Sequence, residues 1–166
     1  MTSHSDITDK LMTDRAGRVF SLFVRQPFAS AMTRKDEHIE IRSARTALRG
    51  DMLICSTQKH DFPNAQGGCT IAMAELYDVK PVHELTEKEW GLTRIQKSRR
   101  SDIQKGFAWF FRDIRRIIEY PAKSKNKIAY IKLNLDDIFI YPKFVIFDKE
   151  VGIDKVRQYL DKDDGS

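Results

Sequence analysis

The 166-residue sequence has only two cysteines, no long hydrophobic run and no leader-like start. Cys55 and Cys69 carry no signal of a disulfide framework, so we expect reduced thiols and a cytoplasmic protein. No apolar run approaches the ~18 residues that a membrane-spanning helix needs, so we expect no membrane partner. Residues 1–6 lack the basic and then apolar layout of a signal peptide.

Common catalytic and metal-binding signatures are also missing. There is no glycine motif that cradles phosphates, no G-x-S-x-G turn and no H-E-x-x-H motif. A zinc site built from Cys55, His60 and Cys69 would need a fourth ligand from Asp61 or His83, and these spacings match no familiar zinc finger. We therefore predict neither a metal site nor a cofactor.

The remaining composition is typical of a folded globular domain. Hydrophobic residues make up 41% and charged residues 32%, and ten Phe, five Tyr and two Trp are more aromatics than a disordered chain carries. We expect a polar tail over residues 1–18, one domain over 19–147, and a helix with a tail over 148–166.

Positive charge is concentrated between residues 94 and 116, where eight basic residues accompany two acidic ones, against a net charge of +5 for the whole chain. Such a patch is expected of a phosphate-binding surface, although a solvated helix face would have the same composition. The predicted phosphate contacts are Arg94, Lys97, Arg99, Arg100, Arg112, Arg115, Arg116, Lys123 and Lys125.

Alternating and β-branched runs predict a chain of strands interrupted by helices. The predicted strands are 19–24, 39–42, 52–55, 69–79, 107–111, 127–133 and 138–147, and the predicted helices are 28–32, a basic insertion at about 86–106 that Thr86 and Glu89 would cap, and 153–160. This order predicts an α+β domain on a small, closed or nearly closed β-barrel, although a flat sheet with helices on one face would give the same pattern.

Glu40 and Arg42 are the clearest candidates for a site. Residues two apart in a strand point to the same face, so both charges share one side while Ile39 and Ile41 take the other. An exposed ion pair and a pair that orients a polar ligand over a cleft both fit this pattern, since a buried carboxylate requires a partner.

Several short blocks form a recognisable series, beginning with Arg25-Gln26-Pro27-Phe28-Ala29 and Glu40-x-Arg42. These blocks resemble the R-Q-P-[FY]-A and central E-x-R motifs of the ASCH domain family of small PUA-like β-barrel modules. Further blocks at 49–59, 68–81, 107–109 and 120–123 extend the resemblance over residues 19–133. The resemblance implies a ligand site lined by Arg25, Gln26, Pro27, Glu40, Arg42, Lys59 and Trp109, with Trp109 stacking on a base.

One departure from the family concerns chemistry. Some ASCH proteins resemble amidohydrolases of acetylated cytidine that use a lysine three residues before the glutamate, where this chain has Glu37, and a threonine, where it has His38. A carboxylate at the lysine position reverses the local charge, so we expect little turnover of N4-acetylcytidine. Glu37 and Glu40 would form an acid/base pair only if a turn brought them together, and we expect His38 at the surface or the sheet edge.

These observations favour an RNA- or nucleotide-binding module. It would hold an unpaired base or nucleotide of single-stranded RNA in a charged cleft, with the basic helix on the phosphates. The alternative is a hydrolase in the same cleft, a ribonuclease or an amidohydrolase on a modified nucleoside, with Glu40 and Glu37 as the catalytic candidates. A third hypothesis is a domain whose basic helix docks on an acidic protein. The sequence does not determine the oligomeric state.

Overall fold

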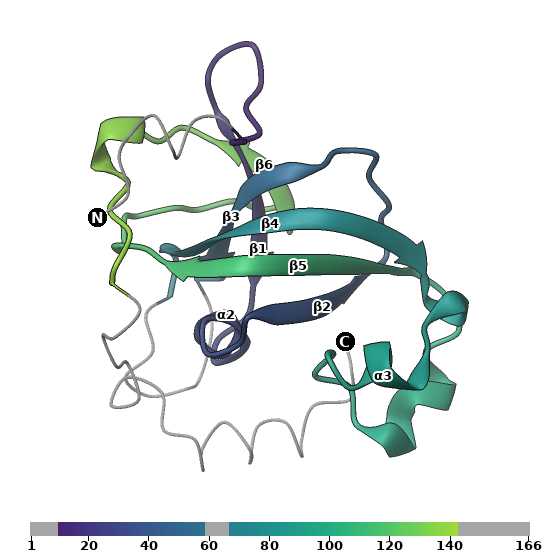
Figure 1. The fold of residues 1–166 in the computed structure, drawn as a ribbon. Coiled ribbons are helices and arrows are strands. Elements are labelled where there is room, and N and C mark those ends of the chain that lie inside the picture. The colour runs from purple at the N-terminus through teal and green to yellow at the C-terminus, as the bar shows by residue number, and fades with distance from the viewer. Residues whose placement is uncertain (1–9, 59–66, 143–166) are drawn as a thin grey trace.

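The computed structural model describes residues 10–58 and 67–142, which form a six-stranded sheet with short helices around it (Figure 1). The strands are β1 (Val19–Val24), β2 (Glu37–Arg42), β3 (Gly50–Ser56), β4 (Thr70–Pro81), β5 (Phe107–Arg116) and β6 (Ile128–Ile131). The α-helices are α2 (Phe28–Met32) and α3 (Glu87–Trp90), and 3-10 helices span Val82–Glu84, Lys97–Asp102 and Leu135–Asp137.

The strand order is β2-β5-β4-β3-β1-β6. Only β1 and β3 are parallel, and the other neighbours are antiparallel. Within the described residues no pairing joins the outer strands β2 and β6, so the sheet remains open there. The prediction of a sheet with a few helices is confirmed, whereas closure into a barrel is not.

Side chains nevertheless connect strands that are far apart in this order. Neighbouring strands lie about 4.8 Å apart, so a flat sheet would separate β2 from β1, four places away, by about 19 Å. The Nη2 atom of Arg42 on β2 instead donates a hydrogen bond of 3.2 Å to the carbonyl of Phe23 on β1. The rings of Phe20 on β1 and Trp109 on β5 stack with their centroids 6.4 Å apart. The sheet is therefore strongly curled.

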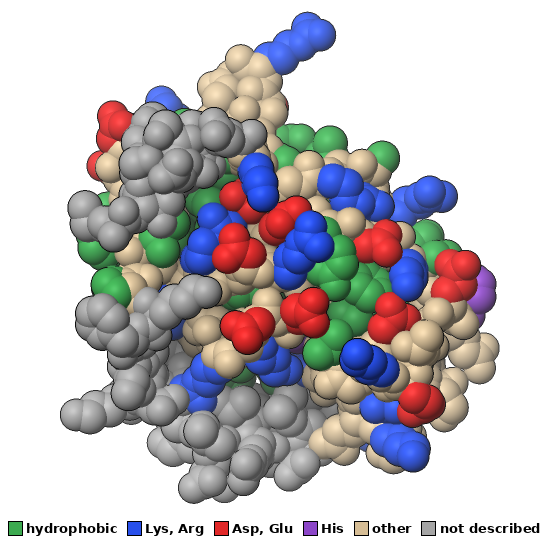
Figure 2. Space-filling model, viewed as in Figure 1, with side chains coloured by type: hydrophobic (Ala, Val, Ile, Leu, Met, Phe, Trp, Pro, Cys, Tyr) green, Lys and Arg blue, Asp and Glu red, His purple; other side chains and the backbone are tan. Residues whose placement is uncertain are grey.

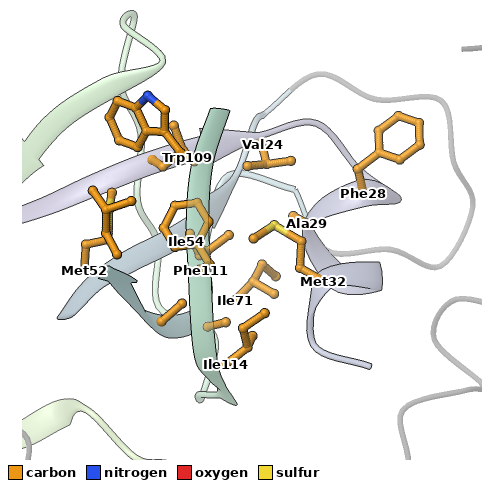
Figure 3. Packing of buried hydrophobic residues seen from close by; sticks show 14 of the residues in the cluster. Val24, Phe28, Ala29, Met32, Met52, Ile54, Ile71, Trp109, Phe111 and Ile114 are labelled. Carbon is orange, nitrogen blue, oxygen red and sulfur yellow. The ribbon is translucent and has the colours of Figure 1, made fainter. Parts of the chain in front are cut away.

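The main hydrophobic core gathers side chains from β1, α2, β3, β4 and β5 (Figure 3). α2 begins after Pro27, whose fixed φ suits a helix start, and it turns Phe28, Ala29 and Met32 into this core. A second cluster, which includes Leu53, Cys55 and Met73, buries the alternate residues of β3 and β4. Burial on both faces explains the unbroken apolar run at residues 52–55.

Most predicted elements are confirmed, including the helix at 28–32 and the capping box of Thr86 and Glu89. The predicted basic helix over 86–106 is instead α3, a turn and the 3-10 helix Lys97–Asp102. The helix ends at its C-cap Gly91, and a turn follows. In this turn the Oγ1 atom of Thr93 accepts a hydrogen bond from the Ile95 amide, a local contact that competes with helix formation.

Several predictions fall partly or wholly outside the described residues. Of the predicted strand 138–147, the structure describes residues up to 142, where Ile140 forms a single bridge with Ile117. The helix at 153–160 and Lys59 lie outside the described residues. None of the helices within 10–58 and 67–142 has the length and hydrophobicity needed to cross a membrane.

Candidate functional site

The candidate site is built around Glu40 in the middle of β2. His38, Glu40 and Arg42 project from the same face of this edge strand, as the two-residue period of a strand requires. Glu40 is only 1% exposed. One carboxylate oxygen, Oε1, lies 3.0 Å from Nε2 of His38, and the other, Oε2, accepts a hydrogen bond of 2.9 Å from Nη2 of Arg42.

Arg94 reaches Glu40 from a distant part of the chain. The segment after α3 runs along the free edge of β2, where the Ile39 amide donates a hydrogen bond of 3.0 Å to the Leu92 carbonyl. This contact places the Nε atom of Arg94 3.8 Å from Oε1 of Glu40. The Arg94 guanidinium also lies over the Phe28 ring, 4.1 Å from its centroid, in a cation–π contact.

Charge in the site is asymmetric. Burial alone would raise the pKa of Glu40, but Arg94, the His38 hydrogen bond and Arg42 outweigh it and lower that pKa to about 2. Lys35 lies near this carboxylate and is exposed over much of its surface. Its ammonium is nevertheless partly dehydrated, which lowers its pKa although Glu40 acts in the opposite sense. We call Lys35, His38, Glu40, Arg42 and Arg94 the Glu40 cluster, in which three cationic residues accompany one carboxylate.

The protonation of His38 follows from its neighbours. Burial lowers the pKa of its imidazole despite Glu40, so at neutral pH the ring is neutral beside an ionised carboxylate. A carboxylate only accepts hydrogen bonds, so Nε2 carries the hydrogen and Nδ1 carries a lone pair. Nδ1 is buried and has no hydrogen-bond partner among the described residues. Leaving a buried polar atom unpaired typically costs about 1–3 kcal/mol.

The structure bears on two expectations about β2. The sequence predicts His38 at the surface or the sheet edge; it lies on the edge strand β2, but it is buried rather than on the surface, with only 3% of the residue exposed and its ring against Glu40. Its position two residues before Glu40 is the signal that would have placed it on the same face. Glu37 is exposed and lies on the other face of β2 from Glu40. In the strand register its partner on β5 is Arg112. The structure therefore does not bring the two carboxylates together.

Two of the other residues that the resemblance assigns to the ligand site instead make contacts within the protein core. Trp109 is fully buried, stacks on Phe20 and donates its indole N–H to the Ala44 carbonyl at 2.9 Å. Gln26 is also fully buried, and its amide group both donates to Ser30 and accepts from the Ser30 amide.

The remaining two residues of that block lie at the start of α2. Pro27 is the N-terminal cap of α2 and is buried. Arg25 is exposed, and its guanidinium lies 5.3 Å from the centroid of the same Phe28 ring that Arg94 contacts. Arg25 and Arg94 therefore share one aromatic neighbour beside the cluster.

The basic stretch does not form one uniform surface. On β5, Arg112 pairs with Glu75 at 3.1 Å, Arg115 with Asp51 at 2.8 Å and Arg116 with Glu119 at 2.7 Å. Over β4 and β5, Figure 2 shows basic and acidic side chains interleaved. Arg100 pairs with Glu87 at 2.9 Å, and the exposed Arg99 lies 3.7 Å from Asp102. Lys97, Lys123 and Lys125 are exposed.

No group of three or more His, Cys, Asp or Glu side chains that could hold a metal ion occurs in the described part of the chain. Cys55 and Cys69 are both buried, and neither forms a disulfide within the described residues. Burial and the nearby Cys69 raise the pKa of the Cys55 thiol, so it stays protonated. Both cysteines therefore belong to the hydrophobic packing.

Comparisons with known proteins confirm the resemblance found in the sequence. The family model of the ASCH domain matches residues 22–139. The crystal structure of ASCH from Zymomonas mobilis is similar, with a TM-score of 0.51 and 16% identity, and the match covers 68% of this chain and 87% of that one. Two mutant structures of that protein match with TM-scores of 0.51 and 0.53, also at 16% identity, over 68% of this chain and 89% and 87% of theirs. No curated protein sequence matches. At this identity the structural likeness shows the fold alone.

Proposed function

Because this chain belongs to the ASCH domain family, we propose that it is a binding module for single-stranded RNA or a nucleotide, with the Glu40 cluster as its site. ASCH domains are generally associated with nucleic acid. The observation that carries the proposal is the group of cationic side chains around one buried carboxylate. The guanidinium groups of Arg42 and Arg94 lie 2.9 and 3.8 Å from the carboxylate oxygens of Glu40, and Lys35 lies near it.

Arginine suits phosphate because its planar guanidinium can donate two parallel hydrogen bonds to phosphate oxygens. Glu40 and the Phe28 ring hold Arg94 in place, so little side-chain freedom remains to be lost when a phosphate binds. We further propose that the curled sheet holds one nucleotide in a cleft over Glu40. The neighbouring phosphates would follow the exposed Lys97 and Arg99 on the 3-10 helix just after Arg94.

The test compares Arg94→Ala with Arg112→Ala, which removes an equal charge from the exposed face of β5. We expect Arg94→Ala to weaken single-stranded RNA binding about tenfold, the loss of one charge-assisted hydrogen bond or more. The slope of log affinity against log salt should become shallower by about 0.7, the value for one phosphate contact on a single strand. Fluorescence anisotropy with a labelled oligoribonucleotide at several salt concentrations measures both quantities.

The control variant decides between a defined site and general surface charge. Arg112 pairs with Glu75 on the outer face, so Arg112→Ala should leave the affinity and the salt slope close to those of the unaltered protein. Equal losses in the two variants would contradict a site at Glu40 and would favour diffuse attraction between the basic protein and RNA.

Hydrolysis is the second candidate function, because Lys35 places an ammonium with a lowered pKa near Glu40. A lysine with a lowered pKa gives up its proton more readily than one with an ordinary pKa. The assay is N4-acetylcytidine deacetylation and RNA cleavage by the unaltered protein and by Lys35→Met. Turnover that disappears in Lys35→Met would assign hydrolysis to this site, and background turnover by both would leave binding as the function.

A further inference from the structure

His38 is a buried polar group that phosphate binding does not use. Only 3% of the residue is exposed, and Nε2 lies 3.0 Å from Glu40, while Nδ1 has no hydrogen-bond partner within residues 10–58 and 67–142. The imidazole shares its face of β2 with Arg42. An acceptor nitrogen therefore lies within a cluster whose other members, apart from Glu40, are donors.

The neighbours of His38 keep this nitrogen an acceptor. Glu40 on the same strand stays ionised because Arg42 and Arg94 stabilise its charge, so it takes the Nε2 hydrogen. Lys35, from the segment before β2, and Arg94, from the segment along the edge of β2, both disfavour a positive charge on the ring. Glu40, Lys35 and Arg94 are the charged groups that act on the imidazole, and the hydrogen bond to Glu40 fixes the tautomer with its lone pair on Nδ1.

We infer that Nδ1 of His38 accepts a hydrogen bond from an N–H or O–H group of the bound nucleotide, and that Glu40 positions the ring for this contact. The inference rests on the proposed function and specifies which part of the ligand is recognised. A phosphate diester carries no donor at neutral pH, so this contact distinguishes a nucleoside unit from a phosphate alone. The donor is either an amino or imino group on the edge of the base or a ribose hydroxyl.

Two substitutions of His38 test the roles of its two ring nitrogens separately. In His38→Gln the side-chain amide can keep a donor near the position of Nε2, but the acceptor at Nδ1 is lost. In His38→Asn the amide oxygen can replace the acceptor at Nδ1, but the donor to Glu40 is lost. An acceptor role predicts that His38→Gln binds single-stranded RNA about tenfold more weakly, whereas His38→Asn stays within about threefold of the unaltered protein. A purely structural role beside Glu40 predicts the reverse order.

A direct readout in the unaltered protein does not depend on how either variant folds. The ¹⁵N resonance of His38 Nδ1 should move toward that of a hydrogen-bonded nitrogen when an oligoribonucleotide is added, and inorganic phosphate at the same ionic strength should leave it in place. Oligodeoxyribonucleotides of the same bases distinguish the two donors. If the oligodeoxyribonucleotide also moves the Nδ1 resonance, the donor is a group on the base. If it does not, the donor is the ribose 2′-hydroxyl.

The outcomes separate this inference from the function on which it rests. Failure of the unaltered protein to bind any oligoribonucleotide would overturn the proposed function and the inference with it. RNA binding that is equal in the unaltered protein and His38→Gln, with an unmoved Nδ1 resonance at saturation, would overturn the inference alone.

Discussion

Replacing Glu40 with glutamine should lower the free energy of unfolding at pH 7 by about 3–5 kcal/mol, the usual cost of removing one partner from a buried ion pair. Glu40 is 1% exposed, and the side chains of Arg42 and Arg94 beside it are only 11% and 12% exposed. In Glu40→Gln both guanidiniums stay largely buried but lose the negative charge of Glu40 beside them. Urea denaturation of the two proteins measures the difference.

Glu75→Gln is the matched control, since Glu75 also pairs with an arginine, Arg112, but at the exposed surface. Surface ion pairs are typically worth no more than about 1 kcal/mol, so this variant should lose little stability. Equal and small losses in the two variants would contradict the account of Glu40 as a buried charge held by its neighbours.

The burial of Glu40 also predicts how the free energy of unfolding depends on pH. The pKa of Glu40 falls from 4.5 to about 2 on folding, so its contribution is complete above pH 4.5 and is lost as the pH falls through about 2. That difference corresponds to about 3 kcal/mol. The lowered pKa of His38 acts in the same direction, because the folded state resists protonation as the pH falls below 6.5. Stability measured from pH 7 to pH 3 should therefore fall less steeply below pH 4.5 in Glu40→Gln than in the unaltered protein.

Replacing Trp109 with alanine should also lower the free energy of unfolding by about 3–5 kcal/mol, as large-to-small changes of core aromatics do. The ring is fully buried, packs on Phe20 and donates a hydrogen bond to the Ala44 carbonyl. Trp109→Phe keeps an aromatic ring and loses that hydrogen bond, so it should cost less, about 1–2 kcal/mol. Thermal and urea unfolding of the three proteins check the order.

This comparison also tests the stacking role that the resemblance implies for Trp109. The buried ring presents no open face to a base, so RNA affinity per folded molecule should be the same in Trp109→Phe and the unaltered protein. A Trp109→Phe protein of normal stability that binds RNA about tenfold more weakly would contradict the core assignment and restore the stacking role.

Local rules predicted much of this fold and part of the site. The two-residue period of a strand placed Glu40 and Arg42 on one face, and the apolar run at 52–55 predicted a core strand. The same rules could not place Arg94 beside Glu40, because that contact depends on the segment after α3 running along the edge of β2. Nor could they show that Arg112 and Arg115 are paired, because Glu75 and Asp51 lie on other strands and meet β5 only through the register of the sheet.

The most direct test of the central claim is a crystal structure of the protein with a short single-stranded oligoribonucleotide. We predict a phosphate within hydrogen-bond distance of the guanidinium groups of Arg42 or Arg94, and a base or ribose donor at Nδ1 of His38. RNA bound over the interleaved charges of β4 and β5, with no contact to the Glu40 cluster, would contradict the proposed site.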